Sequence, residues 1–219
     1  MPPQPAGPPR PTQTEEKRLH AEGYGLVAGV DEVGRGPIAG PVVAAAVILP
    51  DLDGFEHEDF SLVRDSKTLS EGQLARADAL VRSIAVAFGV GEGSSEEIDR
   101  EGIAPATRLA MRRALDGLDH LPDHVLIDAF PLDWRLKPCT PIIKGDALCT
   151  AIAAASIIAK VHRDALMRDL DVRFPGYGLG GHKGYASAEH LAAVASKGPS
   201  PAHRRSFSPF KPTLFTLDA

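Results

Sequence analysis

The stretch Leu26-Val27-Ala28-Gly29-Val30-Asp31-Glu32-Val33-Gly34-Arg35-Gly36 carries the strongest structural signal in the chain. Its first five residues are apolar and suit a buried strand, yet two acids follow directly. Because an unpaired charge is costly to bury, the carboxylates of Asp31 and Glu32 require a cationic partner. The glycines on either side of Arg35 indicate backbone that a ligand approaches closely. The stretch therefore predicts a metal site beside a site for a polyanion.

The pattern around this stretch predicts a mixed α/β layer architecture. A second apolar, β-branched run follows a Gly- and Pro-rich turn, so the two runs are expected to form a hairpin. The helix that begins after Ser70 opens with a capping-box pattern. The predicted strands are 26–30, 42–49, 83–90, 124–128 and 141–146, and the predicted helices are 70–82, 94–118, 147–173 and 188–196.

Three of these strands end in acids: Asp31 with Glu32, Asp128, and Asp146. Neighbouring strands bring such ends together, and clustered carboxylates raise one another's pKa unless divalent cations neutralise them. Oxygen ligands suit Mg²⁺ or Mn²⁺, and two such ions are a common device for hydrolysing a phosphodiester. In the alternative interpretation these acids are solvated strand ends, or Asp146 caps the helix that follows it.

Basic and aromatic residues elsewhere suit a polyanion. Lys67 precedes the helix at 70–82, while Lys160 and Arg163 share a face of the long helix. Tyr185 lies in a glycine-framed basic loop and is suited to stacking on a sugar or base. The ordinary alternatives are that Lys160 and Arg163 are surface charges paired with nearby aspartates, and that Tyr185 is a packing residue.

The charge distribution is uneven along the chain. The net charge of −5 argues against a nucleic-acid partner, but residues 160–219 hold nine lysines and arginines against five acids. The run His203-Arg204-Arg205 is read as a basic patch within this region. A basic C-terminal part beside an acidic body suits a polyanion held next to a carboxylate metal site.

The composition also indicates the cellular compartment in which the protein is expected. No apolar run approaches the roughly 18 residues of a membrane span. Residues 1–14 hold six prolines and lack the apolar core of a signal peptide, so residues 1–22 are predicted to be a disordered tail. Two cysteines without metal-type spacing fit a reduced, cytoplasmic compartment.

Seven sequence blocks, taken together, closely resemble the bacterial ribonuclease HII family of type 2 ribonucleases H. They begin at Val27, Asp65, Val125, Ile142, Ala153, Phe174 and Gly198 and read VAGVDEVGRGPIAGPVVAAAVIL, DSKTLS, VLIDAF, IIKGDAL, AAASIIAKVHRD, FPGYGLGGHKGY and GPSPAHRRSF. The resemblance implies a ribonuclease H-like catalytic core at 23–173, with a C-terminal helical extension at 174–219 that completes the substrate site. It also implies cleavage of the RNA strand in RNA–DNA hybrids and nicking 5′ to single ribonucleotides in duplex DNA, which leaves 5′-phosphate and 3′-hydroxyl ends.

The resemblance also assigns residues. It places the catalytic, metal-binding acids at Asp31, Glu32, Asp128 and Asp146. It places the loop that senses the 2′-hydroxyl at Gly34, Arg35 and Gly36, the stacking tyrosine at Tyr185, and phosphate contacts at Lys67, Lys160 and Arg163. Two departures from the family pattern stand out, because Ala129 follows the third acid where glycine is usual, and Ala186-Ser187 follow the tyrosine.

Several alternatives and partners follow from the same residues. A nuclease of the same fold acting on DNA alone, a non-catalytic hybrid-binding module, and the sister ribonuclease H with an N-terminal hybrid-binding domain all compete with this interpretation. We expect a monomer that acts on RNA–DNA hybrids or on DNA containing ribonucleotides, away from membranes. Residues 212–215 faintly suggest a sliding-clamp peptide.

Overall fold

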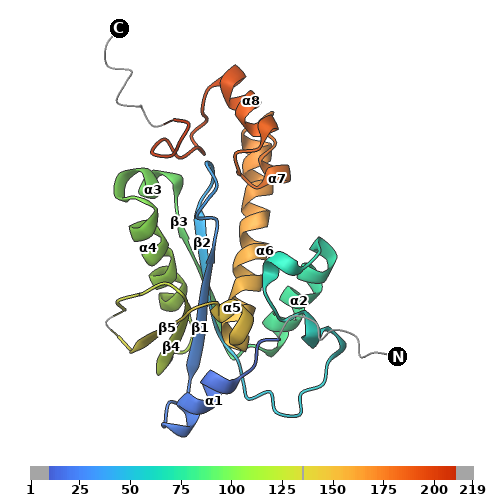
Figure 1. The fold of residues 1–219 in the computed structure, drawn as a ribbon, viewed down its shortest axis with the longest axis vertical. Helices are drawn as coiled ribbons and strands as arrows, with labels where there is room; N and C mark the ends of the chain where they lie inside the picture. The colour runs from blue at the N-terminus through green and yellow to red at the C-terminus, as the bar shows by residue number, and fades with distance from the viewer. Residues whose placement is uncertain (1–9, 135, 211–219) are drawn as a thin grey trace, which may run out of the picture.

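A mixed five-stranded sheet lies at the centre of the protein in the computed structural model, which describes residues 10–134 and 136–210 (Figure 1). The strand order is β3-β2-β1-β4-β5; β1 pairs antiparallel with β2 and parallel with β4. The strands are β1 (Val27–Val33), β2 (Val42–Ile48), β3 (Ala87–Gly93), β4 (His124–Asp128) and β5 (Cys139–Ile142). The α-helices are α1 (Thr14–Ala21), α2 (Glu71–Ile84), α3 (Ser95–Glu101), α4 (Ile103–Asp116), α5 (Gly145–Leu148), α6 (Thr150–Arg173), α7 (Leu179–His182) and α8 (Ala188–Lys197), with 3₁₀ turns η1 (Glu58–Leu62) and η2 (Ser66–Thr68).

Helices cover both faces of the sheet, which confirms the predicted α/β layers. Helices α2 and α6 pack on one face, and α4 packs on the other (Figure 1). Along β1 the side chains alternate, so Val27 joins the α6 cluster while Ala28 and Val30 join the α4 cluster. By the same alternation Asp31 and Glu32 leave opposite faces of the strand.

Helix α6 lies unusually close to β1 because small residues face it. The alanines of its first half are fully buried, as the composition of the helix predicts. A Cβ atom added at Gly29 would overlap backbone atoms of Ala151 and Ile152. Glycine is therefore required at this point of the strand, and the close approach of α6 that it permits places Asp31 under that helix.

Substituting Gly29→Ala is expected to lower the free energy of unfolding by about 3 kcal/mol or more, because backbone cannot yield as a flexible side chain does. Gly72→Ala is the matched control: its Cβ would meet nothing within 4 Å, and it lies in the first turn of α2. Alanine there is expected to stabilise by about 0.5–1 kcal/mol. Equal melting temperatures for the two variants would contradict this packing argument.

Several element boundaries differ from the sequence prediction. The third strand is 87–93 rather than 83–90, because α2 continues to Ile84 and β3 pairs with β2 through Gly93. Its glycines lie where α4 approaches so closely that a Cβ would overlap helix backbone. The helix predicted at 94–118 is split at Gly102, which adopts φ +89°. The last predicted strand, 141–146, is β5 followed by α5.

The prediction of a tail over residues 1–22 is wrong for its second half, since α1 is a helix docked on the core; residues 1–9 lie outside the described part. Glu16 is 3% exposed, and its carboxylate accepts hydrogen bonds from the Ala151 N–H at 2.9 Å and the Cys149 thiol at 3.1 Å. The acid thereby satisfies one of the free amides at the start of α6, that of Ala151. The proline-rich composition of the N-terminal residues gave no sign that Glu16 binds the start of α6.

An ion pair on the α4 face links stability to pH. The Arg113 guanidinium donates two hydrogen bonds to Glu97, at 2.7 and 2.9 Å, and lowers the pKa of Glu97 from 4.5 to about 2. A carboxyl whose pKa is depressed in the folded state stabilises it above the unfolded pKa and loses that contribution as the pH falls toward the folded value.

We expect Glu97→Gln to lower the free energy of unfolding by about 1–2 kcal/mol at neutral pH, since Arg113 is partly exposed. The variant should also lose less stability than the wild type between pH 4.5 and 2. Chemical denaturation across that range measures both effects. Glu96→Gln, at the exposed neighbouring position, serves as control, and an identical pH dependence in all three proteins would refute the ion-pair argument.

Within residues 10–134 and 136–210, none of the helices has the combination of length and hydropathy that crossing a bilayer requires.

Candidate active site

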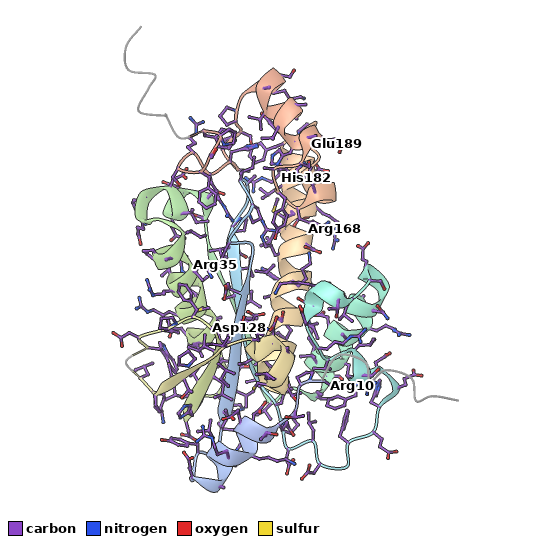
Figure 2. The ribbon with its side chains drawn as sticks, viewed as in Figure 1. Arg10, Arg35, Asp128, Arg168, His182 and Glu189 are labelled. Atoms are coloured by element: carbon purple, nitrogen blue, oxygen red, sulfur yellow. The ribbon has the colours of Figure 1, made fainter. Side chains whose placement is uncertain are left out.

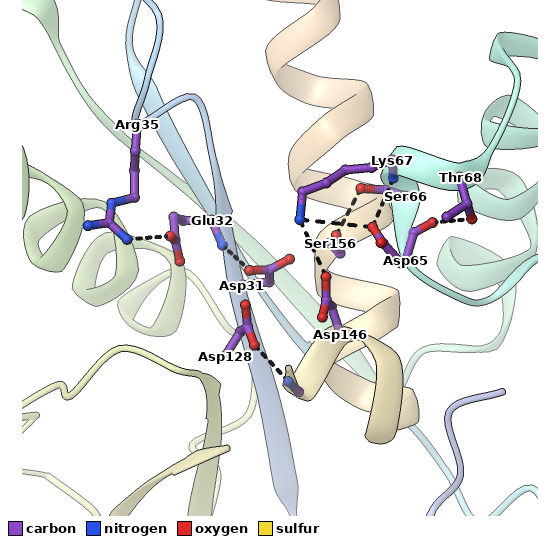
Figure 3. A network of polar contacts seen from close by, with 11 residues as sticks. Asp31, Glu32, Arg35, Asp65, Ser66, Lys67, Thr68, Asp128, Asp146 and Ser156 are labelled. Carbon is purple, nitrogen blue, oxygen red and sulfur yellow. Dashed lines mark hydrogen bonds and ion pairs between the residues drawn. The ribbon is translucent and has the colours of Figure 1, made fainter. Parts of the chain in front are cut away.

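Parallel pairing of β1 and β4 brings two of the predicted acids together. Val30 lies opposite Ile127, so the next residues, Asp31 and Asp128, are neighbours (Figure 3). Asp128 ends β4, whereas β1 continues past Asp31 to Val33 and is longer than the predicted strand 26–30. Asp128 accepts a hydrogen bond of 2.7 Å from the Gly145 N–H, which ties the end of β4 to the start of α5. The predicted convergence of these two acids is confirmed.

Asp146 reaches the same place by a different route. It lies in α5 rather than at a strand end, because β5 ends at Ile142. Nor does it cap a helix: the N-cap of α5 is Lys144, which makes no side-chain cap hydrogen bond. Asp146 is 8% exposed, and its Oδ2 forms an ion pair with Lys67 Nζ at 3.4 Å (Figure 3).

Burial and mutual repulsion set the electrostatics of these carboxylates. Burial, reinforced by the charges of Glu32 and Asp128, raises the pKa of Asp31 well above its ordinary value. Burial also raises the pKa of Glu32, although Arg35 opposes this shift. The pKa of Asp128 is raised by burial and by Asp146, against the hydrogen bond from Gly145. Each of the three acids is therefore held where its negative charge is poorly compensated.

The site contains one polar atom that no protein group satisfies. Glu32 Oε1 accepts from Arg35 at 3.3 Å, but Oε2 is buried and has no hydrogen-bond partner. Lys67 brings positive charge to this group of acids. Burial alone would lower the pKa of Lys67, but the negative charges of Asp65, Asp146 and Asp31 raise it. Among the described residues, no group of three or more acids, histidines or cysteines is arranged so that it could hold a metal ion by itself.

These features fit a divalent cation of the hard, oxygen-binding kind. The available ligands are carboxylate oxygens only, which is the donor set that Mg²⁺ and Mn²⁺ prefer. The orphaned oxygen of Glu32 and the raised pKa values of Asp31, Glu32 and Asp128 are what an incompletely neutralised cation site produces. An oxygen cluster left partly open to solvent leaves coordination positions for water and substrate.

The Gly34-Arg35-Gly36 loop begins directly beyond β1 and is held from below by a buried arginine. The Arg204 guanidinium is fully buried and donates to the carbonyls of Gly34 at 2.6 Å and Arg35 at 3.0 Å. It also donates to the carbonyls of Pro37 and Gly40. Because the loop carbonyls are engaged from inside, its amides are left to face outward. The prediction of a basic patch at 203–205 is therefore wrong for Arg204 and also for His203, which is 2% exposed, whereas Arg205 is exposed.

Arg163 acts in a similar way, and its prediction as a phosphate contact is corrected. It is 1% exposed and donates to the carbonyls of Pro41, Lys183 and Ala39. The arginine thus links the loop after β1 to the loop that carries Tyr185. Lys160 forms an ion pair with Asp164 at 2.7 Å, as the alternative interpretation has it, and keeps a partly exposed side chain.

Tyr185 lies beside the glycine loop. Its ring is about half exposed, and a Cβ built on Gly36 would be 3.7 Å from Tyr185 Cε1. A hydrogen bond from the Ile38 N–H to the Gly184 carbonyl, 2.9 Å long, joins the two segments. Arg35 lies near the middle of the molecule, above Asp128, whereas His182 of α7 lies in the C-terminal layer (Figure 2). An exposed aromatic ring, a glycine loop and the acids thus share one side of the protein.

Two residues of this site escaped the sequence analysis. Ser156 of α6 opposes the rise in the pKa of Asp31, and its Oγ is 2.9 Å from Ser66 Oγ. Arg204 was hidden among basic residues, since a charged triplet gives no sign of which member turns inward. Ala129 adopts φ +42°, a conformation that favours glycine. This conformation explains why glycine usually follows the third acid in the family pattern.

Comparisons with known proteins agree with this geometry. The family model described as Ribonuclease HII matches residues 28–209. The Ribonuclease HII of Dehalococcoides mccartyi strain BAV1 is 49% identical over 201 residues, covering 92% of this chain and 94% of the relative. Other bacterial relatives of the same name reach 47–50% identity.

Solved structures share the fold. Ribonuclease H2 from Pyrococcus horikoshii superposes with a TM-score of 0.70 at 26% identity, over 84% of this chain and 95% of that one. An Archaeoglobus fulgidus structure, described as a PCNA:RNase HII complex, gives a TM-score of 0.64 at 26% identity, over 87% and 98%. The ribonuclease H-like fold is therefore confirmed, and the chain belongs to the ribonuclease HII family of metal-dependent endoribonucleases that act on RNA–DNA hybrids.

Proposed function

We propose that this endoribonuclease also nicks duplex DNA on the 5′ side of a single embedded ribonucleotide and leaves 5′-phosphate and 3′-hydroxyl ends. The observation that carries the proposal is the clamp of Arg204 on the loop that follows Asp31 and Glu32. It leaves outward-facing amides next to a carboxylate cluster. A 2′-hydroxyl is the group that distinguishes RNA from DNA, and backbone amides in a rigid loop can recognise one such group without a longer RNA stretch.

We assign the metal site to the four acids Asp31, Glu32, Asp128 and Asp146, with two Mg²⁺ or Mn²⁺ ions as the proposed cofactors. Bound there, divalent ions would supply an activated water and would stabilise the leaving oxygen of the phosphodiester. The four carboxylates would hold the ions, and Lys67, which pairs with Asp146, would neutralise part of the remaining charge and contact a substrate phosphate. Gly34, Arg35 and Gly36 orient the ribonucleotide through its 2′-hydroxyl.

Tyr185 is proposed to stack on the nucleotide next to the ribonucleotide, because an exposed ring beside a glycine loop offers an apolar platform to a sugar or base. Lys160 is proposed as a weaker phosphate contact. In this arrangement the core at 23–173 supplies the chemistry, and the C-terminal extension at 174–219 completes the substrate site.

We propose a monomer that is active in the reducing cytoplasm, where its free cysteines, Cys139 and Cys149, stay reduced. The residues suggestive of a sliding-clamp peptide, 212–215, lie outside the described part of the chain. The likeness to the archaeal protein described in complex with PCNA supports clamp recruitment as part of the proposal.

The experiment compares four labelled duplexes with identical sequence: all DNA, DNA with one ribonucleotide, DNA with one 2′-O-methyl ribonucleotide, and an RNA–DNA hybrid. We expect cleavage of the second and fourth with Mg²⁺ or Mn²⁺, and none of the first and third, because the methyl group blocks the close approach of the loop amides to the 2′ oxygen. Phosphatase and ligase treatment of the products identifies their ends. Cleavage of the hybrid alone would overturn the single-ribonucleotide activity, and cleavage of all-DNA duplex would indicate a general nuclease.

A further inference from the structure

Three histidines of the C-terminal extension, His182, His190 and His203, lie side by side and away from the carboxylates; we call them the histidine stack. The ring centroids of His182 and His190 are 4.2 Å apart and those of His190 and His203 are 5.1 Å apart. His190 and His203 are almost completely buried. Buried imidazoles need a partner for each ring nitrogen, so their hydrogen bonds can be traced completely.

Backbone groups at the two ends fix the protonation pattern of His190 and His203. The Ser200 N–H donates to His203 Nδ1 at 3.0 Å, so that nitrogen carries no proton in the neutral ring. The Tyr185 carbonyl lies 2.8 Å from His190 Nδ1, which must therefore donate. The remaining pair, His203 Nε2 and His190 Nε2 at 3.0 Å, is then satisfied only with the proton on His203.

The result is a directed chain of hydrogen bonds from Ser200 through both rings to the Tyr185 carbonyl. Burial lowers the pKa of His203 to about 4, so the neutral, complete chain is the form present near neutral pH. Burial lowers the pKa of His190 as well. In a dry environment each of these hydrogen bonds is costly to lose, because its partner is left unsatisfied.

The chain of hydrogen bonds ends at the Tyr185 carbonyl, and the backbone just before this residue has a conformation that other groups must stabilise. Lys183 and Gly184 both adopt positive φ, +53° and +83°. The Gly184 N–H donates to His182 Nδ1 at 3.1 Å, and His182 stacks on His190. The histidine stack therefore holds the backbone on which the exposed Tyr185 ring depends, yet none of its rings is near the carboxylates.

We propose that His190 and His203 are positioning residues for Tyr185: their hydrogen-bond chain to its carbonyl sets where the ring meets the nucleic acid. This inference deepens the proposed function and rests on its substrate role for Tyr185. The two histidines touch neither the substrate nor the reacting atoms, so they act on binding and not on the chemical step.

The test uses a pair of substitutions that differ in which ring nitrogen they mimic. In His190→Asn the side-chain amide lies near the Nδ1 position and keeps a donor for the Tyr185 carbonyl. In His190→Gln the amide lies near Nε2 and loses that donor. For a duplex with one ribonucleotide we expect His190→Gln to raise KM about tenfold with kcat changed less than about threefold, a size typical of one base–aromatic stack. His190→Asn keeps the donor to Tyr185 but no longer accepts from His203 Nε2, so it should raise KM by an intermediate amount, about threefold, with kcat changed less than that.

A double-mutant cycle with Tyr185→Ala separates positioning from general damage. In that background His190→Gln should raise KM by no more than about twofold, because the ring it positions is gone. A full tenfold increase in both backgrounds would overturn the positioning role while the proposed function stands. If Tyr185→Ala itself leaves KM unchanged, the substrate role of Tyr185 fails, and this inference fails with it. His120→Gln, at an exposed position, is the matched control.

A measurement on the unmodified enzyme covers the case in which His190→Gln does not fold. Nitrogen-15 NMR distinguishes protonated from bare ring nitrogens. We expect His190 to be protonated at Nδ1 and bare at Nε2, and His203 to show the reverse. The opposite tautomer at His190 would break the chain to Tyr185 and would overturn the proposal.

Discussion

Replacing Asp128 by asparagine is expected to lower the cleavage rate by at least about a thousandfold without lowering the melting temperature. Charge stabilisation by a metal site amounts to several kcal/mol, and each 1.4 kcal/mol is about tenfold in rate. Asparagine removes one negative charge from the group formed with Asp31 and Asp146, so cations bind less well. The amide oxygen can still accept the hydrogen bond from Gly145, and relief of repulsion offsets any loss of stability.

Rates are measured on a duplex with one ribonucleotide over a range of Mn²⁺ concentrations, beside thermal melting of the same samples. Asp119→Asn, an exposed acid in the turn before β4, is the matched control and should retain the wild-type rate. Full activity of folded Asp128→Asn would remove Asp128 from the proposed site.

Replacing Arg204 by methionine is expected to have the second largest effect, on both stability and substrate recognition. The Arg204 side chain donates hydrogen bonds to four carbonyls of the loop between β1 and β2, whereas methionine has a similar length but no donor. Leaving several buried acceptors unpaired costs about 3–5 kcal/mol in total, even though removing the buried charge offsets part of the loss. Burial lowers the pKa of Arg204 to about 9, which reflects how unfavourable its environment is for a charge without a carboxylate partner.

A loosened loop should also lower the preference for a ribonucleotide, because its amides no longer hold a fixed direction. We expect the rate on the single-ribonucleotide duplex to fall by about two orders of magnitude, a loss comparable to that of a preorganised hydrogen-bond donor. Chemical denaturation and nicking assays at a temperature where the variant is folded measure the two effects separately. Arg205→Met changes the exposed neighbour and should behave as wild type; equal behaviour of both variants would contradict the clamp.

Much of the site was predictable because the features that carry it are local in sequence. Two acids after an apolar run have few structural explanations, and pairing of β1 with β4 then places Asp31 beside Asp128. The alternating apolar residues and the alanine-rich start of α6 likewise determine the two layers. The chemistry of the Gly34–Gly36 loop follows from its position directly after the acids.

The remaining features depend on long-range packing, which no local pattern reports. Arg163 and Arg204 look like surface charges in sequence, and only the loops folded over them show that both point inward. Asp146 belongs to a short helix because the chain turns after Ile142, yet it still lies close enough to Asp128 to raise its pKa, and it pairs with Lys67. The third strand was misplaced because its glycines, which resemble a strand end, are needed for close contact with α4.

The most direct test of the metal-dependent cleavage proposed here is a single-turnover nicking assay on a duplex with one ribonucleotide, with Mn²⁺ or with chelator, for the wild type and Asp128→Asn. We expect one nick on the 5′ side of the ribonucleotide, only with wild-type protein and only when the divalent cation is present. A nick of the same rate with chelator, or with the folded variant, would contradict the assignment of cleavage to cations held by these carboxylates.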